Sequence, residues 1–216
     1  MTSYSPTERS RVKRAPDRGK YDKAAVFAII DAALMCHIGY TIKGQPYVTP
    51  TFHWREGERL YWHGSSASRM IETIEQGVPV CFTASLLDGI VVARSGFHHS
   101  ANYRAVMAFG TARLVPDAEK ERSLELFMER CFPGRWPTLR PANKQEMKGT
   151  KILSMEIEEA SAKVRTGPPK DDEEDYALPI WAGVVPVHTV IGAPENDPRI
   201  LPGVETPAHI RGLKIG

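Results

Sequence analysis

The chain has 216 residues, with 28 Lys and Arg side chains against 26 Asp and Glu side chains, a formal net charge of +2 at pH 7. That length predicts a single domain with at most an extension, and the near-neutral charge argues against a dedicated nucleic-acid-binding protein. No apolar run approaches the roughly 18 residues that a membrane-spanning helix needs. The hydrophobic fraction of 42% is enough to build a packed core.

The N-terminal segment and the cysteines bear on where the protein resides. Basic side chains within residues 1–20 precede an apolar stretch, as in a signal peptide, but Asp31 interrupts that stretch and no A-x-A-like cleavage site follows. We therefore predict a basic, flexible arm over residues 1–20, with contact to nucleic acid or an anionic surface as the alternative. Cys36, Cys81 and Cys131 match no CxxC spacing, which predicts reduced thiols in a cytoplasmic protein.

The spacing of apolar residues predicts one helix followed by a series of strands. Asp22 is the expected N-cap of the helix, and one helical face is expected to carry Val26, Ile29, Ile30, Ala33 and His37. From residue 36 the period is two, and the predicted strands are 36–42, 46–54, 59–63, 78–86, 90–95, 102–115 and 151–159. Turns are expected at 43–45 and 55–58 and at Asp88-Gly89, a hairpin-type dipeptide.

Two further helices are predicted, over residues 67–76 and 118–130, the second capped by Asp117 and carrying an apolar stripe. About seven short strands with hairpin-type links predict a mainly β (α+β) domain over residues 21–167, an antiparallel barrel with peripheral helices. Gly110 lies inside the longest strand, where a bend is expected. The chain has neither GxGxxG nor GxxxxGK[ST], so a classical dinucleotide or P-loop fold is not expected.

The last quarter of the chain is built differently. Eight of the 17 prolines follow residue 167, and an acidic run over residues 171–175 separates the barrel from this tail. Residues 178–187 are too apolar for a free linker. We predict that residues 168–216 form an acidic linker and a Pro-rich C-terminal arm that packs on its own barrel or on a second subunit.

The most informative segment is the end of the strand at Gly64 and the helix start that follows it. Ser65, Ser66 and Ser68 supply hydroxyl groups, and Arg69 supplies a guanidinium in the first helical turn. Free backbone N–H groups at a helix start, together with these donors, suit a phosphate group. The alternative is that one serine only caps the helix and Arg69 only reaches solvent.

This segment resembles the phosphate-binding strand–loop–helix of the FMN-binding split-barrel family, the pyridoxamine 5′-phosphate oxidase superfamily. Within that superfamily the chain most resembles the nitroimidazole-resistance-protein-like branch. Residues 45–52 resemble the strand beside the isoalloxazine ring, 102–110 the long strand of the dimer interface, and 179–186 a tryptophan-containing C-terminal segment. The resemblance covers roughly residues 21–187 and implies a split β-barrel.

The resemblance also implies a set of cofactor-binding residues. They are Val48, Thr49, Pro50, Thr51, His63, Ser65, Ser66, Ser68, Arg69 and Trp181. In this set Ser68 and Arg69 would bind the FMN phosphate, residues 49–51 would lie along the flavin ring, and Trp181 would cover the flavin or anchor the arm. Met70 stands where pyridoxamine phosphate oxidases often have Lys, so vitamin B6 oxidase activity is not expected.

The histidines allow several readings. His63 is a candidate for a contact with the cofactor, for a catalytic proton donor, or for a packed side chain, and no other catalytic residue is assigned. His98 and His99 are adjacent, so on an extended segment they point apart, and no carboxylate or cysteine lies at ligand spacing. No metal site is therefore predicted.

The resemblance implies a homodimer with one FMN at each interface site and both subunits contributing to each pocket. The expected function is that of an FMN-dependent oxidoreductase that passes electrons from NAD(P)H to a small organic acceptor of nitroaromatic or quinone type. The alternative is a flavin- or haem-binding protein with a storage, sensing or stress function. Neither nucleic acid nor a membrane is an expected partner.

Overall fold

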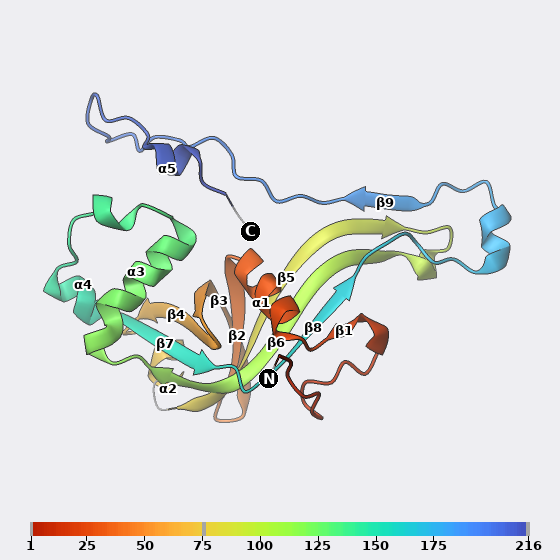
Figure 1. Ribbon diagram of the computed structural model, residues 1–216, viewed down its shortest axis with the longest axis horizontal. Helices are drawn as coiled ribbons and strands as arrows, with labels where there is room; N and C mark the ends of the chain where they lie inside the picture. The colour runs from red at the N-terminus through yellow and green to blue at the C-terminus, as the bar shows by residue number, and fades with distance from the viewer. Residues whose placement is uncertain (1, 75–76, 215–216) are drawn as a thin grey trace. The chain divides into compact units, whose positions relative to one another are not determined.

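The computed structural model describes residues 2–74 and 77–214 (Figure 1). The chain divides into two compact units. The first unit contains Met1–Ala33, Cys81–Phe109 and Glu158–Thr189, and the second contains Leu34–Val80, Gly110–Ile157 and Val190–Gly216. Strands β5 (Val78–Val92) and β6 (Ser100–Leu114) are long enough to contribute residues to both units.

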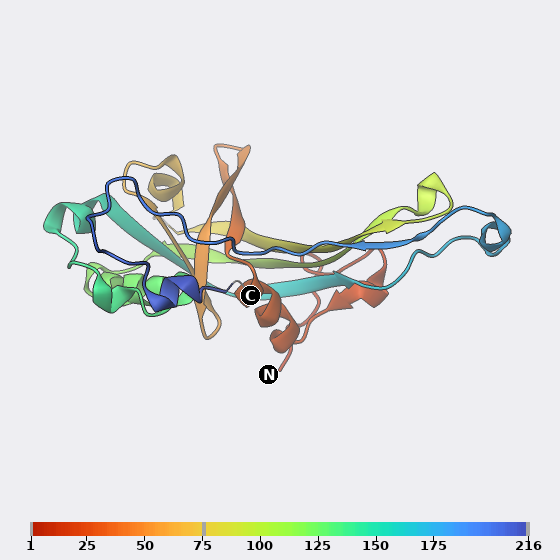
Figure 2. The same ribbon diagram turned by 90° about the horizontal axis from the view of Figure 1, so that it is seen from above.

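The first unit is built on antiparallel strands. Besides its parts of β5 and β6 it contains η1 (Pro16–Arg18), β1 (Gly19–Lys20), α1 (Lys23–Ala32), η2 (Gly96–His98), β8 (Glu159–Arg165), η5 (Glu173–Ala177) and β9 (Gly183–Pro186). Strand β8 pairs with β1 and β6, and β9 pairs with β5. The turned view of Figure 2 shows α1, in red-orange, against one side of β8.

Helix α1 forms as the sequence predicts. The Asp22 carboxylate accepts a hydrogen bond from the Ala25 N–H at 2.8 Å, and this satisfies one of the free amides of the first turn. Val26, Ile29 and Ile30 are buried, which confirms this part of the stripe, and Ala33 is buried at the helix end. The placement of His37 on the same helical face is wrong, because α1 ends at Ala32 and His37 is an exposed residue of a strand over Met35–Ile42.

The predicted hairpin at Asp88-Gly89 is wrong, because β5 continues through both residues. The Asp88 carboxylate accepts hydrogen bonds from Arg104 of β6 at 2.8 and 3.0 Å, and Gly89 pairs with Pro186 of β9. A Cβ at Gly89 would lie 2.9 Å from the Val184 Cγ1 atom. The glycine therefore permits the close approach of β9 rather than a turn.

The strand predicted over residues 151–159 is two strands. Strand β7 (Thr150–Glu156) belongs to the second unit and β8 to the first. Between them the Ile157 N–H donates to the Glu58 carbonyl and the Glu158 N–H to the Phe109 carbonyl, both at 3.0 Å. These long-range bonds end one ladder and begin the next, which period-two alternation does not reveal.

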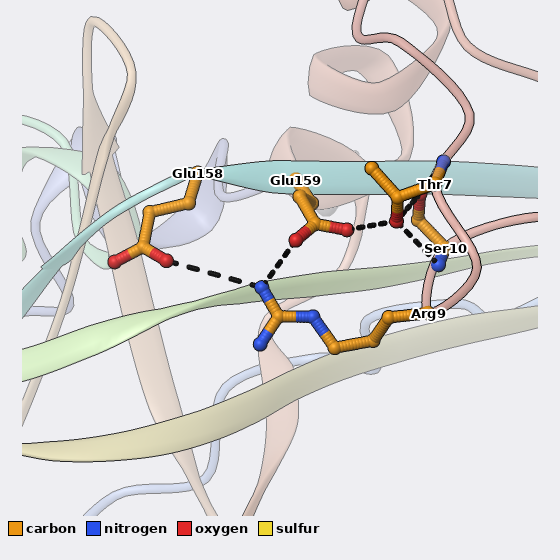
Figure 3. A network of polar contacts seen from close by, with 5 residues as sticks. All are labelled: Thr7, Arg9, Ser10, Glu158 and Glu159. Atoms are coloured by element: carbon orange, nitrogen blue, oxygen red, sulfur yellow. Dashed lines mark hydrogen bonds and ion pairs between the residues drawn. The ribbon is translucent and has the colours of Figure 1, made fainter.

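The described part of the N-terminal segment is not a free arm (Figure 3). The Arg9 guanidinium lies 2.5 Å from one oxygen of Glu159 and 3.9 Å from Glu158. The Thr7 hydroxyl donates to the other Glu159 oxygen, and these bonds lower the pKa of Glu159. Ser10 is buried, and β1 adds two residues to the edge of β8. Long-range partners thus order a segment whose composition alone suggests a solvated tail.

In the second unit the antiparallel strands follow the order β6-β7-β4-β3-β2, and a short part of β5 also belongs to this unit. Its further elements are β2 (Met35–Ile42), β3 (Gln45–Glu56), β4 (Arg59–Ser65), α2 (Arg69–Ile74), η3 (Asp117–Glu119), α3 (Lys120–Cys131), η4 (Trp136–Thr138), α4 (Lys144–Gly149) and α5 (Ala208–Arg211). Leu60, Trp62 and Leu153 are fully buried between them. The predicted helix end at residues 75–76 lies outside the described residues.

Local signals within the second unit have mixed outcomes. Lys43 and Gly44 have φ values of 48° and 82°, which close the β2–β3 hairpin as predicted. Asp117 does not cap α3, because it lies in the short helix η3 and forms a 2.6 Å ion pair with the buried amine of Lys120. At Gly110 a Cβ would lie 2.2 Å from the Glu156 carbonyl oxygen, so only glycine fits where β6 passes β7.

The C-terminal segment docks as a strand and then continues in extended form. Strand β9 pairs with β5 of its own chain over residues 183–186. Most side chains after Val187 are exposed. The chain is thus mainly β, with antiparallel pairing throughout, as the sequence predicts. Within residues 2–74 and 77–214, no helix has the length and apolar character needed to span a bilayer.

Candidate functional site

The first half of β3 has an open edge. Residues 45–52 pair with β2, whereas the pairing with β4 covers only His53–Glu56. Among the described residues, the edge of 45–52 that faces away from β2 therefore has no strand partner. Backbone groups along such an edge can bond a ligand.

Two prolines decide which groups this edge offers. A proline within a paired strand sits where its missing N–H would point away from the partner strand. Pro46 and Pro50 pair with Thr41 and His37 of β2, so their positions face the open edge, and Val48 shares this direction because backbone groups alternate along a strand. The Val48 N–H is thus the central donor of the edge, flanked by the carbonyls of the two prolines.

The side chains of this half-strand divide between two faces. Val48 is 65% exposed, and Pro50 is exposed on the same face. Thr49 and Thr51 lie on the opposite face and are partly buried, and the Thr49 hydroxyl lies 3.1 Å from that of Tyr40. Val48 and the three residues expected along the flavin ring, 49–51, are therefore adjacent in the strand but present different sides of it.

The Ser65–Arg69 turn follows β4. Two backbone hydrogen bonds of 2.9 Å hold the turn. The Ser68 N–H donates to the Ser65 carbonyl within the turn, and the Ser66 N–H donates to the carbonyl of Gly149, at the end of α4. The hydroxyl groups of Ser66 and Ser68 make no hydrogen bond with the part of the chain that the structure describes. Donors from these hydroxyls remain available to a bound anion.

Arg69 connects this turn to the open edge of β3. Its guanidinium carbon lies 5.2 Å from the centre of the Tyr47 ring, and the side chain is exposed. Tyr47 in turn stacks on Tyr40 at 5.8 Å. No carboxylate within the described residues lies within ion-pair distance of Arg69. The cation is therefore placed beside the open edge with its hydrogen-bonding capacity unused.

His63 lies among aromatic side chains. Its ring centre is 4.7 Å from that of Phe127 and 6.2 Å from that of Trp54. Burial lowers the pKa of His63, so the imidazole is neutral near pH 7, and its buried Nδ1 atom has no hydrogen-bond partner in the described chain. A neutral imidazole is a poor proton donor and a good metal ligand.

Phe127 also lines a pocket of about 490 Å³ between α3, η4 and α4. The apolar lining residues are Leu124, Phe127, Met128, Trp136, Leu139, Pro141 and Ala142, and Glu121, Arg140 and Glu146 complete the wall. Arg140 and Glu146 form an ion pair, and this bond together with the Asn143 N–H, which also donates to Glu146, lowers the pKa of Glu146 to about 2. Sequence reasoning missed this pocket, although the apolar stripe of residues 118–130 was its visible signal.

The remaining predicted residues lie elsewhere. Trp181 belongs to the first unit, is 66% exposed and packs over Gly183, so the structure does not bring it to Ser68 and Arg69 within one unit. His98 lies 3.4 Å from Asp172, and the His99 ring bonds the Ser95 carbonyl. Within residues 2–74 and 77–214, no three His, Cys, Asp or Glu side chains are grouped to hold a metal ion.

Comparison with known proteins identifies a matching family and similar solved structures. The family model described as pyridoxamine 5′-phosphate oxidase matches residues 22–164. The structure of the flavocytochrome Anf3 from Azotobacter vinelandii is 47% identical, covering 99% of this chain and 100% of that one, with a TM-score of 0.93. The FAD and haem binding protein from Mycobacterium smegmatis is 32% identical, covering 90% of this chain and 96% of that one, with a TM-score of 0.87.

A third structure is more distant. A 5-nitroimidazole antibiotic resistance protein from Bacteroides thetaiotaomicron is 24% identical, covering 66% of this chain and 84% of that one, with a TM-score of 0.56. At that identity the likeness concerns the fold alone. The comparison with curated protein sequences returns no match.

Proposed function

Because the chain belongs to the pyridoxamine 5′-phosphate oxidase family of flavin-binding split barrels, we propose that it is a flavin-dependent electron-transfer protein. The flavin ring lies along the open edge of β3, and its phosphate binds the Ser65–Arg69 turn. The observation that carries this proposal is the contact of Arg69 with Tyr47, which joins the anion-binding donors to the open edge in one unit.

The residues present suit this cofactor. The hydroxyls of Ser66 and Ser68 and the guanidinium of Arg69 offer the phosphate three unused donor groups. The Val48 N–H and the carbonyls of Pro46 and Pro50 offer one donor and two acceptors to the polar edge of the ring. A bound flavin supplies hydride and one-electron transfer chemistry, while the protein orients it.

The sequence predicts FMN, but we propose FAD as the form bound. Two relatives that span nearly the whole chain are named as a flavocytochrome and as an FAD and haem binding protein. FAD contains the FMN moiety, so the same turn and strand edge serve either cofactor. Release of the cofactor by heat, followed by chromatography against FMN and FAD standards, decides between them.

Haem is a second proposed cofactor, and two observations in the second unit favour it. The pocket of about 490 Å³ beside α3 is walled mainly by apolar side chains, and neutral His63 packs on Phe127, one of its walls. His63, which contacts the Phe127 wall but does not itself line the pocket, would ligate the iron, and Arg140 would exchange its partner Glu146 for a propionate group. This arrangement suits the flavocytochrome name of the 47% identical relative.

We further propose that the protein works as a homodimer that accepts electrons from NAD(P)H and passes them to a small organic acceptor. Large apolar side chains that are exposed in the single chain, among them Val48 at 65%, Met107 at 47% and Trp181 at 66%, offer surface that a second copy would cover. Sedimentation analysis of the purified protein tests the dimer, and anaerobic mixing with NADH or NADPH tests electron entry through bleaching of the flavin band.

The decisive experiment is the visible spectrum of the purified protein and of an Arg69→Ala variant. Flavin bands in the wild type that are lost or weakened in this variant support the proposal, and a Soret band supports haem. Arg199→Ala, which removes another exposed guanidinium, is the matched control. A colourless protein that binds neither added FAD nor added FMN contradicts the proposal.

A further inference from the structure

A second pocket, in the first unit, is unusually rich in positive charge. It encloses about 240 Å³ where η1 and β1 meet the end of β8. Its lining residues are Asp17, Arg18, Lys20, Val164, Arg165, Thr166 and Lys170. Four cationic side chains thus face one carboxylate in a small space.

Arg165 is the buried member of this group, with 7% of its surface exposed. Its guanidinium donates to neutral acceptors, the side-chain oxygen of Asn102 and the carbonyls of Gly167 and Pro168. Within the described chain no carboxylate lies at ion-pair distance. Burial of a charge without an opposite charge is costly, so this position is suited to an external anion.

The other cations add to the same excess. Arg18, Lys20 and Lys170 form no ion pair with the described residues, and Asp17 is exposed. Strand β1 fixes the N-terminal cations against β8 by pairing Gly19 with Lys163 and Lys20 with Ala162. Burial lowers the pKa of Arg165, and the neighbouring charge of Arg18 lowers it further. The positive charges are therefore held together although they repel one another.

We propose that this pocket binds a phosphate-rich anion of the pyrophosphate class, free or as the diphosphate of a soluble nucleotide. Its walls are polar and include no aromatic ring to stack on a base. A guanidinium group can bind two phosphate oxygens at once through two parallel N–H bonds. The volume of the pocket is below the roughly 300–1,000 Å³ of typical small-molecule sites, which favours a small anion. The lining residues all belong to the first unit, and none of them belongs to the Ser65–Arg69 turn.

Isothermal titration of the flavin-loaded protein with pyrophosphate, ADP and adenosine tests the proposal. Pyrophosphate and ADP bind, and adenosine does not. Equal affinity for the first two identifies the diphosphate as the whole ligand, whereas tighter ADP binding identifies a nucleotide. Raising the salt concentration from about 0.05 to about 0.5 M weakens binding, because the exposed cations are screened.

Variants locate the site. Arg18→Gln combined with Lys170→Gln weakens pyrophosphate binding at least about tenfold, given the usual strength of charged hydrogen bonds. Arg18 is half-buried and Lys170 is exposed, and neither belongs to the Ser65–Arg69 turn, so an unchanged flavin spectrum reports an intact fold. Arg14→Gln removes an exposed charge of the same segment outside the pocket and leaves the affinity unaltered. The proposal is overturned if pyrophosphate does not bind, or if the double variant binds it as tightly as the wild type.

Discussion

His63 in the second unit and Arg165 in the first respond differently to the same physical pressure. Burial lowers the pKa of both side chains. The imidazole can release its proton and packs as a neutral ring on Phe127, with one nitrogen free for a ligand. The guanidinium stays charged, collects neutral acceptors and lies among further cations. One buried base thus suits a metal, and the other suits an anion.

The largest expected effect concerns Arg69, the exposed counterpart of these two bases. Replacing Ser68 and Arg69 together by Ala weakens flavin binding by about 2–4 kcal/mol, because charged hydrogen bonds to the phosphate are lost. The free energy of unfolding of the cofactor-free protein changes little, since water already solvates both side chains. Flavin titration by fluorescence and urea denaturation measure the two quantities. Equal affinity in the variant would place the phosphate elsewhere.

Replacing Arg165 is expected to change flavin binding less than replacing Ser68 and Arg69, but to change the free energy of unfolding more. Replacement by Ala lowers the free energy of unfolding by about 2 kcal/mol, because the Asn102 side chain loses its donor and packing is lost. Arg14→Ala is the exposed control and leaves stability unchanged. Urea denaturation of both variants checks this. A variant as stable as the wild type would mean that removing the buried charge offsets the lost bonds.

The imidazole of His63 predicts that the free energy of unfolding depends on pH. Its folded-state pKa lies below the unfolded value, so the unfolded chain binds the extra proton and stability falls as pH drops below about 6.5. The slope contributed by this one group reaches at most about 1.4 kcal/mol per pH unit. Replacing His63 by Phe removes that contribution. Denaturation curves between pH 7 and pH 5, run on both proteins, would show parallel profiles if His63 were not the titrating group.

The smallest effect is expected at Arg9, where the ion pair with Glu159 lies at the surface (Figure 3). Arg9→Gln raises the pKa of Glu159 but leaves part of the lowering in place, because the Thr7 hydroxyl still donates to that carboxylate. Added salt reduces the difference between the two proteins. NMR titration of the Glu159 side chain measures this shift. A pKa that does not move in the variant would assign the whole effect to Thr7.

Sequence reasoning reached those features whose cause is local. The cap at Asp22 and the turn at Lys43-Gly44 depend on side chains and φ values within a few residues. The hairpin predicted at Asp88-Gly89 is wrong because β5 continues there and Gly89 pairs with Pro186 of β9, which is distant in sequence. The composition of the N-terminal segment suggests a solvated arm, since the partner of Arg9, Glu159, lies 150 residues away along the chain.

In the candidate site, too, the features with a local cause can be predicted from the sequence and those that depend on distant residues cannot. The Ser65–Arg69 turn is visible in the sequence because its donors are consecutive. Its contact with Tyr47 and the open edge of β3 depends on where the pairing with β4 stops, at His53 and Trp62. The pocket beside α3 needs side chains from three helices, and the Arg165 pocket needs both ends of the first unit's chain. Such convergence has no signature in residue spacing.

The two prolines of β3 have a consequence for the solubility of the chain before it acquires a cofactor. An unpaired strand edge is a template on which another extended chain can add and start aggregation. Pro46 and Pro50 withhold every second donor that such an incoming strand would need, so its ladder would be interrupted on both sides of Val48. A small ligand needs only the one donor between them. The same two residues would therefore oppose the addition of a strand while leaving the Val48 N–H available to a small ligand.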